Sequence, residues 1–158
     1  MKRIDILKLL VCLILCQLAG FIGALFTTPA IPTWYATLRK PFFTPPNWIF
    51  SPVWISLFIL MGISLFFVWR RPEHPKFKIA LIFFFVQLIL NTLWSVAFFG
   101  LKSPLLGLVD IVLLWIAILL TIQNFLKVSK MAGLLLLPYL LWVSFAALLN
   151  FSLWFLNH

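Results

Sequence analysis

The sequence predicts an all-α integral membrane protein, built as one bundle of five transmembrane helices with a long loop between the first two helices. The first observation behind this prediction is composition: 65% of the 158 residues are hydrophobic and 9% are charged, whereas soluble domains carry roughly 25% charged residues. The second is that the apolar residues gather in five runs, each long enough to cross a bilayer as a helix of about 20 residues. The third is that these runs do not alternate apolar and polar positions, which excludes a membrane β-barrel.

In chain order, the expected spans cover residues 6–26, 48–69, 77–99, 104–125 and 131–155. The first run follows a short basic start, as a signal peptide does. It exceeds the roughly 7–15 apolar residues of such a peptide, so we expect a retained helix. The second run begins after Pro45 and Pro46, and Pro104 suits the first turn of the fourth. Pro138 permits a kink inside the fifth helix, because it removes a backbone donor.

The lysines and arginines predict the orientation of the bundle. Three of the twelve, Arg39, Lys40 and Lys102, lie in the first and third breaks between runs. Because cytoplasmic segments of membrane proteins are enriched in Lys and Arg, we expect the N-terminus in the cytoplasm and the C-terminus outside. Cations spread in this way form no basic helix or tail, so no nucleic-acid partner is expected. The other nine lie near the start of the first run, in or next to the second break, and in the fourth break: Lys2, Arg3, Lys8, Arg70, Arg71, Lys76, Lys78, Lys127 and Lys130.

The longest break, residues 27–47, is the one segment between the runs that is large enough to cover something. It contains Trp34 and Tyr35, and it is rich in proline. Irregular backbone cannot be satisfied inside lipid, so this loop must lie outside the hydrocarbon. We expect it to face away from the cytoplasm and to act as a lid on the bundle.

The third run carries a polar stripe made of Gln87, Asn91, Trp94 and Ser95. Their spacing places them on one face of a helix. Such a stripe in a membrane helix faces protein or a cavity and not lipid. Two interpretations stay open: hydrogen bonds between helices, or the wall of a cavity that holds an amphipathic ligand. The bulky Trp94 ring favours the second.

Two other runs present aromatic faces. In the second run Trp54 and Phe58 share a face near the long loop. In the fifth run four residues recur at helical spacing, namely Trp142, Phe145, Ala146 and Leu149. These faces are candidates for the remaining walls of the same cavity.

Few residues offer chemistry inside the spans. Asp110 is the one acid there. We expect it to be either a structural group, in an ion pair with Lys102 or Arg39 or hydrogen-bonded, or a group that handles ligand or protons. No span contains histidine, and Cys12 and Cys16 have no acid or histidine nearby, so no metal site, haem ligation or cofactor is expected. No catalytic set of Ser, His and Asp is present either.

Taken together, these features resemble the translocator protein family, also called the tryptophan-rich sensory protein or TspO/MBR family. The resemblance covers nearly the whole chain. It rests on Trp34 and Tyr35, on Thr44 with Pro45 and Pro46, on the polar stripe of the third run, on Leu108, Val109 and Asp110, and on Leu137, Pro138, Tyr139, Trp142, Asn150 and Trp154.

The resemblance implies a five-helix bundle that forms a homodimer, with a pocket opening toward the first loop. Family ligands are porphyrins such as protoporphyrin IX, benzodiazepine-like molecules and sterols. Sterol binding is not expected here, because Phe151 and Phe155 replace the Tyr and Arg of the cholesterol motif. The short C-terminus favours a bacterial plasma-membrane protein. The expected ligand-binding residues are Tyr35, Trp54, Phe58, Gln87, Asn91, Trp94, Trp142, Phe145, Ala146 and Leu149.

Three functions remain in competition at this point. The favoured one is binding of tetrapyrroles for sensing or transport, without turnover. The first alternative is a light- and oxygen-dependent enzyme that degrades porphyrin, which in the family depends on tryptophans matching Trp54 and Trp142. The second alternative is a membrane scaffold that acts on no small molecule.

Overall fold

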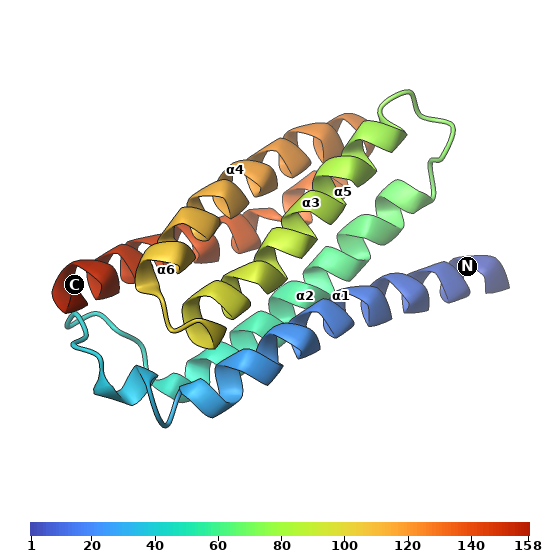
Figure 1. The fold of residues 1–158 in the computed structure, drawn as a ribbon. Coiled ribbons are helices and arrows are strands. Elements are labelled where there is room, and N and C mark those ends of the chain that lie inside the picture. Colours follow the sequence, from blue (N-terminus) through green and yellow to red (C-terminus); the bar gives the residue numbers. More distant parts are fainter.

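The computed structural model describes the whole chain, residues 1–158, as helices joined by short segments (Figure 1). Five helical segments are long and apolar enough to cross a membrane, which confirms the predicted all-α membrane fold. Helices α5 and α6 together form the fifth segment. The helices are α1 (Arg3–Ala30), α2 (Asn47–Trp69), α3 (Phe77–Ser95), α4 (Pro104–Val128), α5 (Lys130–Leu135) and α6 (Leu137–Asn157), with a 3₁₀ turn η1 (Tyr35–Thr37) and a π-helical turn η2 (Val96–Gly100).

Helix α1 continues past the end predicted for the first span, through Thr27 to Ala30. The Thr27 hydroxyl donates to the Gly23 carbonyl of its own helix at 3.2 Å, so this polar side chain is satisfied without leaving the helix. The connecting loop is therefore shorter than predicted and runs over residues 31–46. Below we call this segment the α1–α2 loop.

The fifth run is divided at Leu136. The Leu136 amide donates to the Gly133 carbonyl at 3.2 Å, three residues back, and regular spacing resumes where the Leu140 amide donates to Leu136 at 3.1 Å. The division lies just before Pro138, whose missing amide donor weakens the helix there. The kink permitted by this proline therefore takes the form of a short break.

Consecutive membrane spans run antiparallel (Figure 1). Around the bundle, α1 packs between α2 and α3, α4 packs between α3 and α6, and α5 packs against α2 and α4. Helices α1 and α2 pack closely at Gly62, where a Cβ atom would lie 2.9 Å from the Leu13 side chain. At Gly20 a Cβ would lie 2.6 Å from the Phe58 ring. These glycines therefore admit close helix contacts within the bundle.

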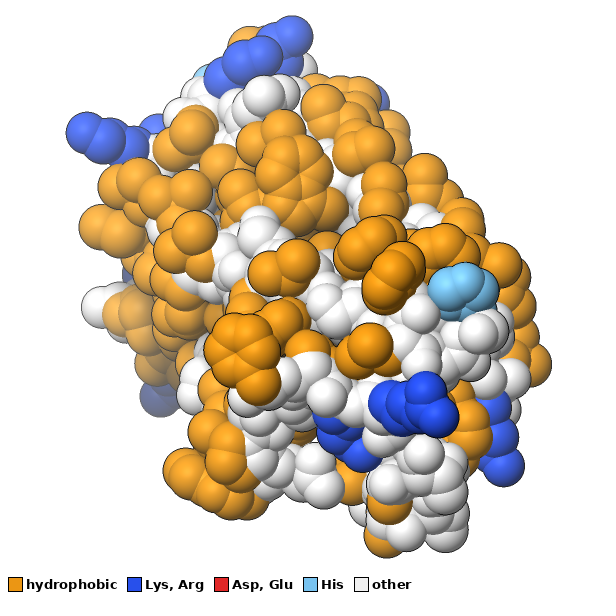
Figure 2. Space-filling model, turned by 90° about the vertical axis from the view of Figure 1, so that its left-hand side faces the viewer, with side chains coloured by type: hydrophobic (Ala, Val, Ile, Leu, Met, Phe, Trp, Pro, Cys, Tyr) orange, Lys and Arg blue, Asp and Glu red, His pale blue; other side chains and the backbone are white.

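The two ends of the bundle differ in charge. The N-terminus, the α2–α3 connection and the α4–α5 junction share one end, and the α1–α2 loop shares the other with the C-terminus (Figure 1). Nine of the twelve cations belong to the first end. Figure 2 looks at the end with the α1–α2 loop and shows small groups of Lys and Arg, no Asp or Glu, and apolar side chains over most of the visible surface.

Candidate functional site

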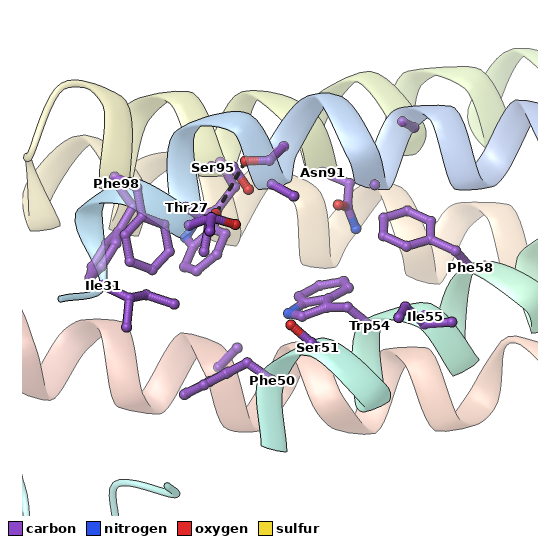
Figure 3. Close-up of a pocket in the computed structure, with 18 of the residues that line it drawn as sticks. Thr27, Ile31, Phe50, Ser51, Trp54, Ile55, Phe58, Asn91, Ser95 and Phe98 are labelled. Atoms are coloured by element: carbon purple, nitrogen blue, oxygen red, sulfur yellow. Dashed lines mark hydrogen bonds between the residues drawn. The ribbon is translucent and has the colours of Figure 1, made fainter. Parts of the chain in front are cut away.

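A cavity of about 350 Å³ lies in the half of the bundle next to the α1–α2 loop. Helices α1, α2, α3 and α6 form its walls, and Tyr35 of the loop closes part of it. Most of the lining is apolar and aromatic. Trp54 of α2 and Asn91 of α3 point toward one another across the space (Figure 3).

On the α2 side, the Trp54 ring is held by two aromatic neighbours. Its centroid lies 5.8 Å from that of Phe58 and 6.3 Å from that of Tyr139. Phe58 in turn packs where Gly20 of α1 has no side chain. The missing Cβ of a glycine thus sets the position of this aromatic wall.

On the α3 side, the polar stripe forms hydrogen bonds between helices. The Asn91 Nδ2 donates to the Tyr139 hydroxyl at 2.6 Å, and that hydroxyl donates to the Gln87 Oε1 at 2.8 Å. The Trp94 Nε1 donates to the Asn150 Oδ1 at 2.9 Å. Asn91 and Trp94 also line the cavity. The stripe therefore forms hydrogen bonds between helices and also contributes to the cavity wall. Their nitrogen donors are engaged inside the protein.

Two polar atoms in the cavity wall have no hydrogen-bond partner. They are the Trp142 Nε1 and the Tyr35 hydroxyl, and both are buried. Burial also raises the pKa of Tyr35, so its phenol stays protonated at neutral pH and remains a donor. A buried donor without a partner costs about 1–3 kcal/mol. The apolar cavity therefore presents two donors that an acceptor on a ligand would satisfy.

The α1–α2 loop is fixed to the end of α6. The Arg39 amide donates to the Asn157 Oδ1 at 2.8 Å, and the Asn157 Nδ2 donates back to the Arg39 carbonyl at 2.9 Å. Tyr35 is 3% exposed and packs 5.8 Å from the Phe99 ring. The Lys40 ammonium lies 4.7 Å from the centre of the Tyr35 ring on the loop itself. The hydrogen bonds with Asn157 and the contact of Tyr35 with Phe99 hold the loop against this end of the bundle.

Eight of the ten expected ligand-binding residues line this cavity. Gln87 lies outside the lining, because its carbonyl oxygen is used by Tyr139 deeper in the bundle. Phe145 also lies outside and packs against Phe43 of the loop, with ring centroids 6.2 Å apart. The eight that line the cavity are Tyr35, Trp54, Phe58, Asn91, Trp94, Trp142, Ala146 and Leu149.

The sequence reasoning missed the contribution of α1. Small residues there indicated helix packing, and their small side chains are also what leaves room for the cavity. The π-helical turn η2 added a second unexpected group, since no pattern in the sequence marked it. Ser95, which the polar stripe had indicated, also lines the cavity. The residues missed are Gln17, Ala19, Gly20, Phe21, Gly23, Ala24, Thr27, Thr28 and Ile31 on α1 or just after it, Phe50, Ser51 and Ile55 on α2, Phe98 and Phe99 in η2, and Asn150 and Leu153 on α6.

Asp110 does not pair with Lys102 or Arg39, so the predicted ion pair is wrong. The one ion pair in the chain joins Arg70 to Asp5, with the Arg70 Nε 3.7 Å from the Asp5 Oδ1. Asp110 also lies outside the cavity lining, and its Oδ2 is buried without a hydrogen-bond partner. At the position of Asp110 on α4, no cation lies close enough to its carboxyl group to form an ion pair.

The fold and the cavity define a class: a multi-pass helical membrane protein with an aromatic cavity next to the loop between its first two helices. The chain belongs to the TspO/MBR family, whose sequence profile matches residues 12–155. It is 51% identical to the tryptophan-rich protein TspO of Chlorobaculum tepidum over 97% of this chain and 98% of that protein. It is 49% identical to the protein of the same name from Archaeoglobus fulgidus, over 97% and 99% of the two chains. Identity to the human translocator protein is 36%, over 90% of this chain and 85% of the human one. The resemblance found in the sequence is thereby confirmed.

Proposed function

We propose that this protein binds tetrapyrroles such as protoporphyrin IX in the cavity, for sensing or transport. The observation that carries the proposal is the pair of unpaired donors, Tyr35 and Trp142, in an otherwise apolar and aromatic wall. A flat aromatic macrocycle with carboxylate groups matches both features, since its ring stacks on indole and phenyl faces and its oxygens accept hydrogen bonds. Relatives named translocator and tryptophan-rich sensory protein support a transport or sensing role.

The α1–α2 loop acts in this proposal as a lid. Tyr35 closes the cavity from the loop side, and Pro41, Pro45 and Pro46 stiffen the segment that follows. A stiff segment loses less conformational freedom when it closes on a ligand, so less binding free energy is spent on ordering it. Benzodiazepine-like molecules, which are also apolar and aromatic, are a second ligand class for the same cavity.

Degradation of porphyrin in light and oxygen is the second candidate function. The observation that favours it is that Trp54 and Trp142 both line the cavity, where their indoles would meet an excited porphyrin and supply electrons. In this version the porphyrin is substrate and photosensitiser, and no further cofactor is needed.

Absorbance of the purified protein with protoporphyrin IX, first in darkness and then in light, tests these functions together. A spectral shift in darkness that persists without bleaching supports binding alone. Bleaching that requires the protein and yields a new product supports the enzyme. A spectrum identical to that of free porphyrin under both conditions contradicts both and leaves the scaffold interpretation.

A further inference from the structure

A second depression lies at the opposite end of the bundle, where α2 ends against the junction of α4 and α5. Its volume is about 420 Å³. The cavity under the α1–α2 loop shares none of its residues, and the proposed function leaves it unused. Its lining combines three cations, one hydroxyl and two apolar side chains: Arg70, Arg71, Lys130, Ser129, Phe67 and Met131.

Two of the three cations of this depression, Arg70 and Arg71, are held in place, and only Arg70 meets a carboxylate. The Arg71 Nη1 donates to the Val128 carbonyl at 3.0 Å, which fixes the guanidinium at the end of α4 and leaves its other donors free. Arg70 meets one carboxylate, that of Asp5, at 3.7 Å, and its side chain remains 48% exposed. Lys130 is exposed and forms no ion pair. The depression therefore carries excess positive charge with several free donors.

Two apolar residues complete the lining of the depression, Phe67 and Met131. Phe67 is half-buried near the end of α2, and Met131 is 52% exposed at the start of α5. Both residues lie at the ends of segments that are apolar enough to cross the membrane, at the boundary between hydrocarbon and head groups. Cationic and apolar surfaces thus adjoin at the depth where a lipid phosphate meets its acyl chains.

We propose that this depression binds the phosphodiester head group of an anionic phospholipid. Arg70, Arg71 and Lys130 surround the phosphate, and Phe67 and Met131 contact the first carbons of the acyl chains. Guanidinium groups suit this role because their planar donors match phosphate oxygens in pairs. Basic pockets between membrane helices on the cytoplasmic side bind such head groups, and this end carries nine of the twelve cations. The apolar wall favours a lipid over free phosphate.

The test is a lipid titration of the detergent-purified protein, with bound lipids counted by native mass spectrometry. Dioleoylphosphatidylglycerol is compared with dioleoylphosphatidylcholine and with inorganic phosphate. Each cation near an anionic lipid contributes about fivefold in affinity. We therefore expect Arg70→Gln/Lys130→Gln to weaken phosphatidylglycerol binding about 25-fold and to leave phosphatidylcholine binding unchanged. Arg70→Lys/Lys130→Arg keeps both charges and should retain most of the binding.

The matched control is Lys76→Gln/Lys78→Gln, which removes two exposed cations from the same end outside the depression. An equal loss in this control would show attraction by general surface charge and would overturn the site. Inorganic phosphate that competes with the lipid at comparable concentration would overturn the lipid as the ligand. If the double variant does not fold, judged by circular dichroism, the single Lys130→Gln change still tests the site, with about fivefold weaker binding expected.

Discussion

Tyr35 and Tyr139 have the same side chain but opposite hydrogen-bonding environments. The Tyr35 hydroxyl is buried without a partner. The Tyr139 hydroxyl accepts from Asn91 at 2.6 Å and donates to Gln87 at 2.8 Å in the centre of the bundle. One hydroxyl is available to a ligand, and the other joins α6 to α3.

Replacing each tyrosine by phenylalanine should therefore give opposite results. We expect Tyr139→Phe to lower the free energy of unfolding by about 2–4 kcal/mol, because it leaves the buried amides of Asn91 and Gln87 without their partner. Tyr35→Phe removes an unpaired hydroxyl and should leave the stability of the ligand-free protein equal or slightly higher. Unfolding in detergent, followed by circular dichroism, measures both. Equal losses in the two variants would contradict this assignment.

Trp142 is the second unpaired donor, and Trp142→Phe keeps most of its volume. We expect no loss of stability and about fivefold weaker binding of protoporphyrin IX, the value of one neutral hydrogen bond of about 1 kcal/mol. If the protein degrades porphyrin through indole radicals, photobleaching should collapse in this variant while most binding survives. Bleaching that continues unchanged in both Trp142→Phe and Trp54→Phe would reject the enzymatic interpretation.

At the scale of whole elements, the α1–α2 loop is hydrogen-bonded to α6 through one side chain, that of Asn157. Asn157 forms two hydrogen bonds with the backbone of Arg39, accepting one from its amide and donating one to its carbonyl. Paired residues in a β-sheet exchange hydrogen bonds in the same way. Asn124 offers a matched control, since its amide bonds only the Leu120 carbonyl of its own helix, at 2.8 Å.

We expect Asn157→Leu to free the loop without unfolding the bundle. Hydrogen exchange over residues 31–46 should rise, and protoporphyrin IX should dissociate faster because the loop no longer covers the cavity. Asn124→Leu should change neither rate. Unchanged exchange in Asn157→Leu would mean that aromatic contacts such as that of Tyr35 with Phe99 hold the loop without this pair.

The helices also differ in how much of their role could be predicted from the sequence. The five spans were predictable, because hydrocarbon imposes length and composition directly on each helix. Half of the eight expected cavity residues were predictable because tryptophan and asparagine stand out among leucines, and the other half followed from helical spacing and the family resemblance. The α1 wall was not, because Gly20 and Gly23 contribute space and no chemical group. Gln87 was placed on the cavity wall by its spacing alone, and spacing does not reveal that Tyr139 occupies its oxygen.

At the scale of the whole molecule, the distribution of cations leads us to expect the N-terminal end in the cytoplasm. Leu101→Cys lies at the other end and is 63% exposed, whereas Glu73→Cys lies in the exposed α2–α3 connection. An impermeant thiol reagent applied to intact cells should label Leu101→Cys and not Glu73→Cys. Native Cys12 and Cys16, 1% and 0% exposed, should stay unlabelled. The reverse pattern would invert the proposed orientation.

The central claim, that the cavity under the α1–α2 loop binds a tetrapyrrole, is tested most directly by a binding titration of protoporphyrin IX in darkness. The variant is Trp54→Ala/Trp142→Ala, and the control is Trp48→Ala/Trp115→Ala, which removes two tryptophans that do not line the cavity. With about 1 kcal/mol or more for each aromatic contact, the cavity variant should bind at least about 30-fold more weakly, and the control should match the wild type. Equal affinity in the cavity variant and the wild type would contradict the proposed binding site.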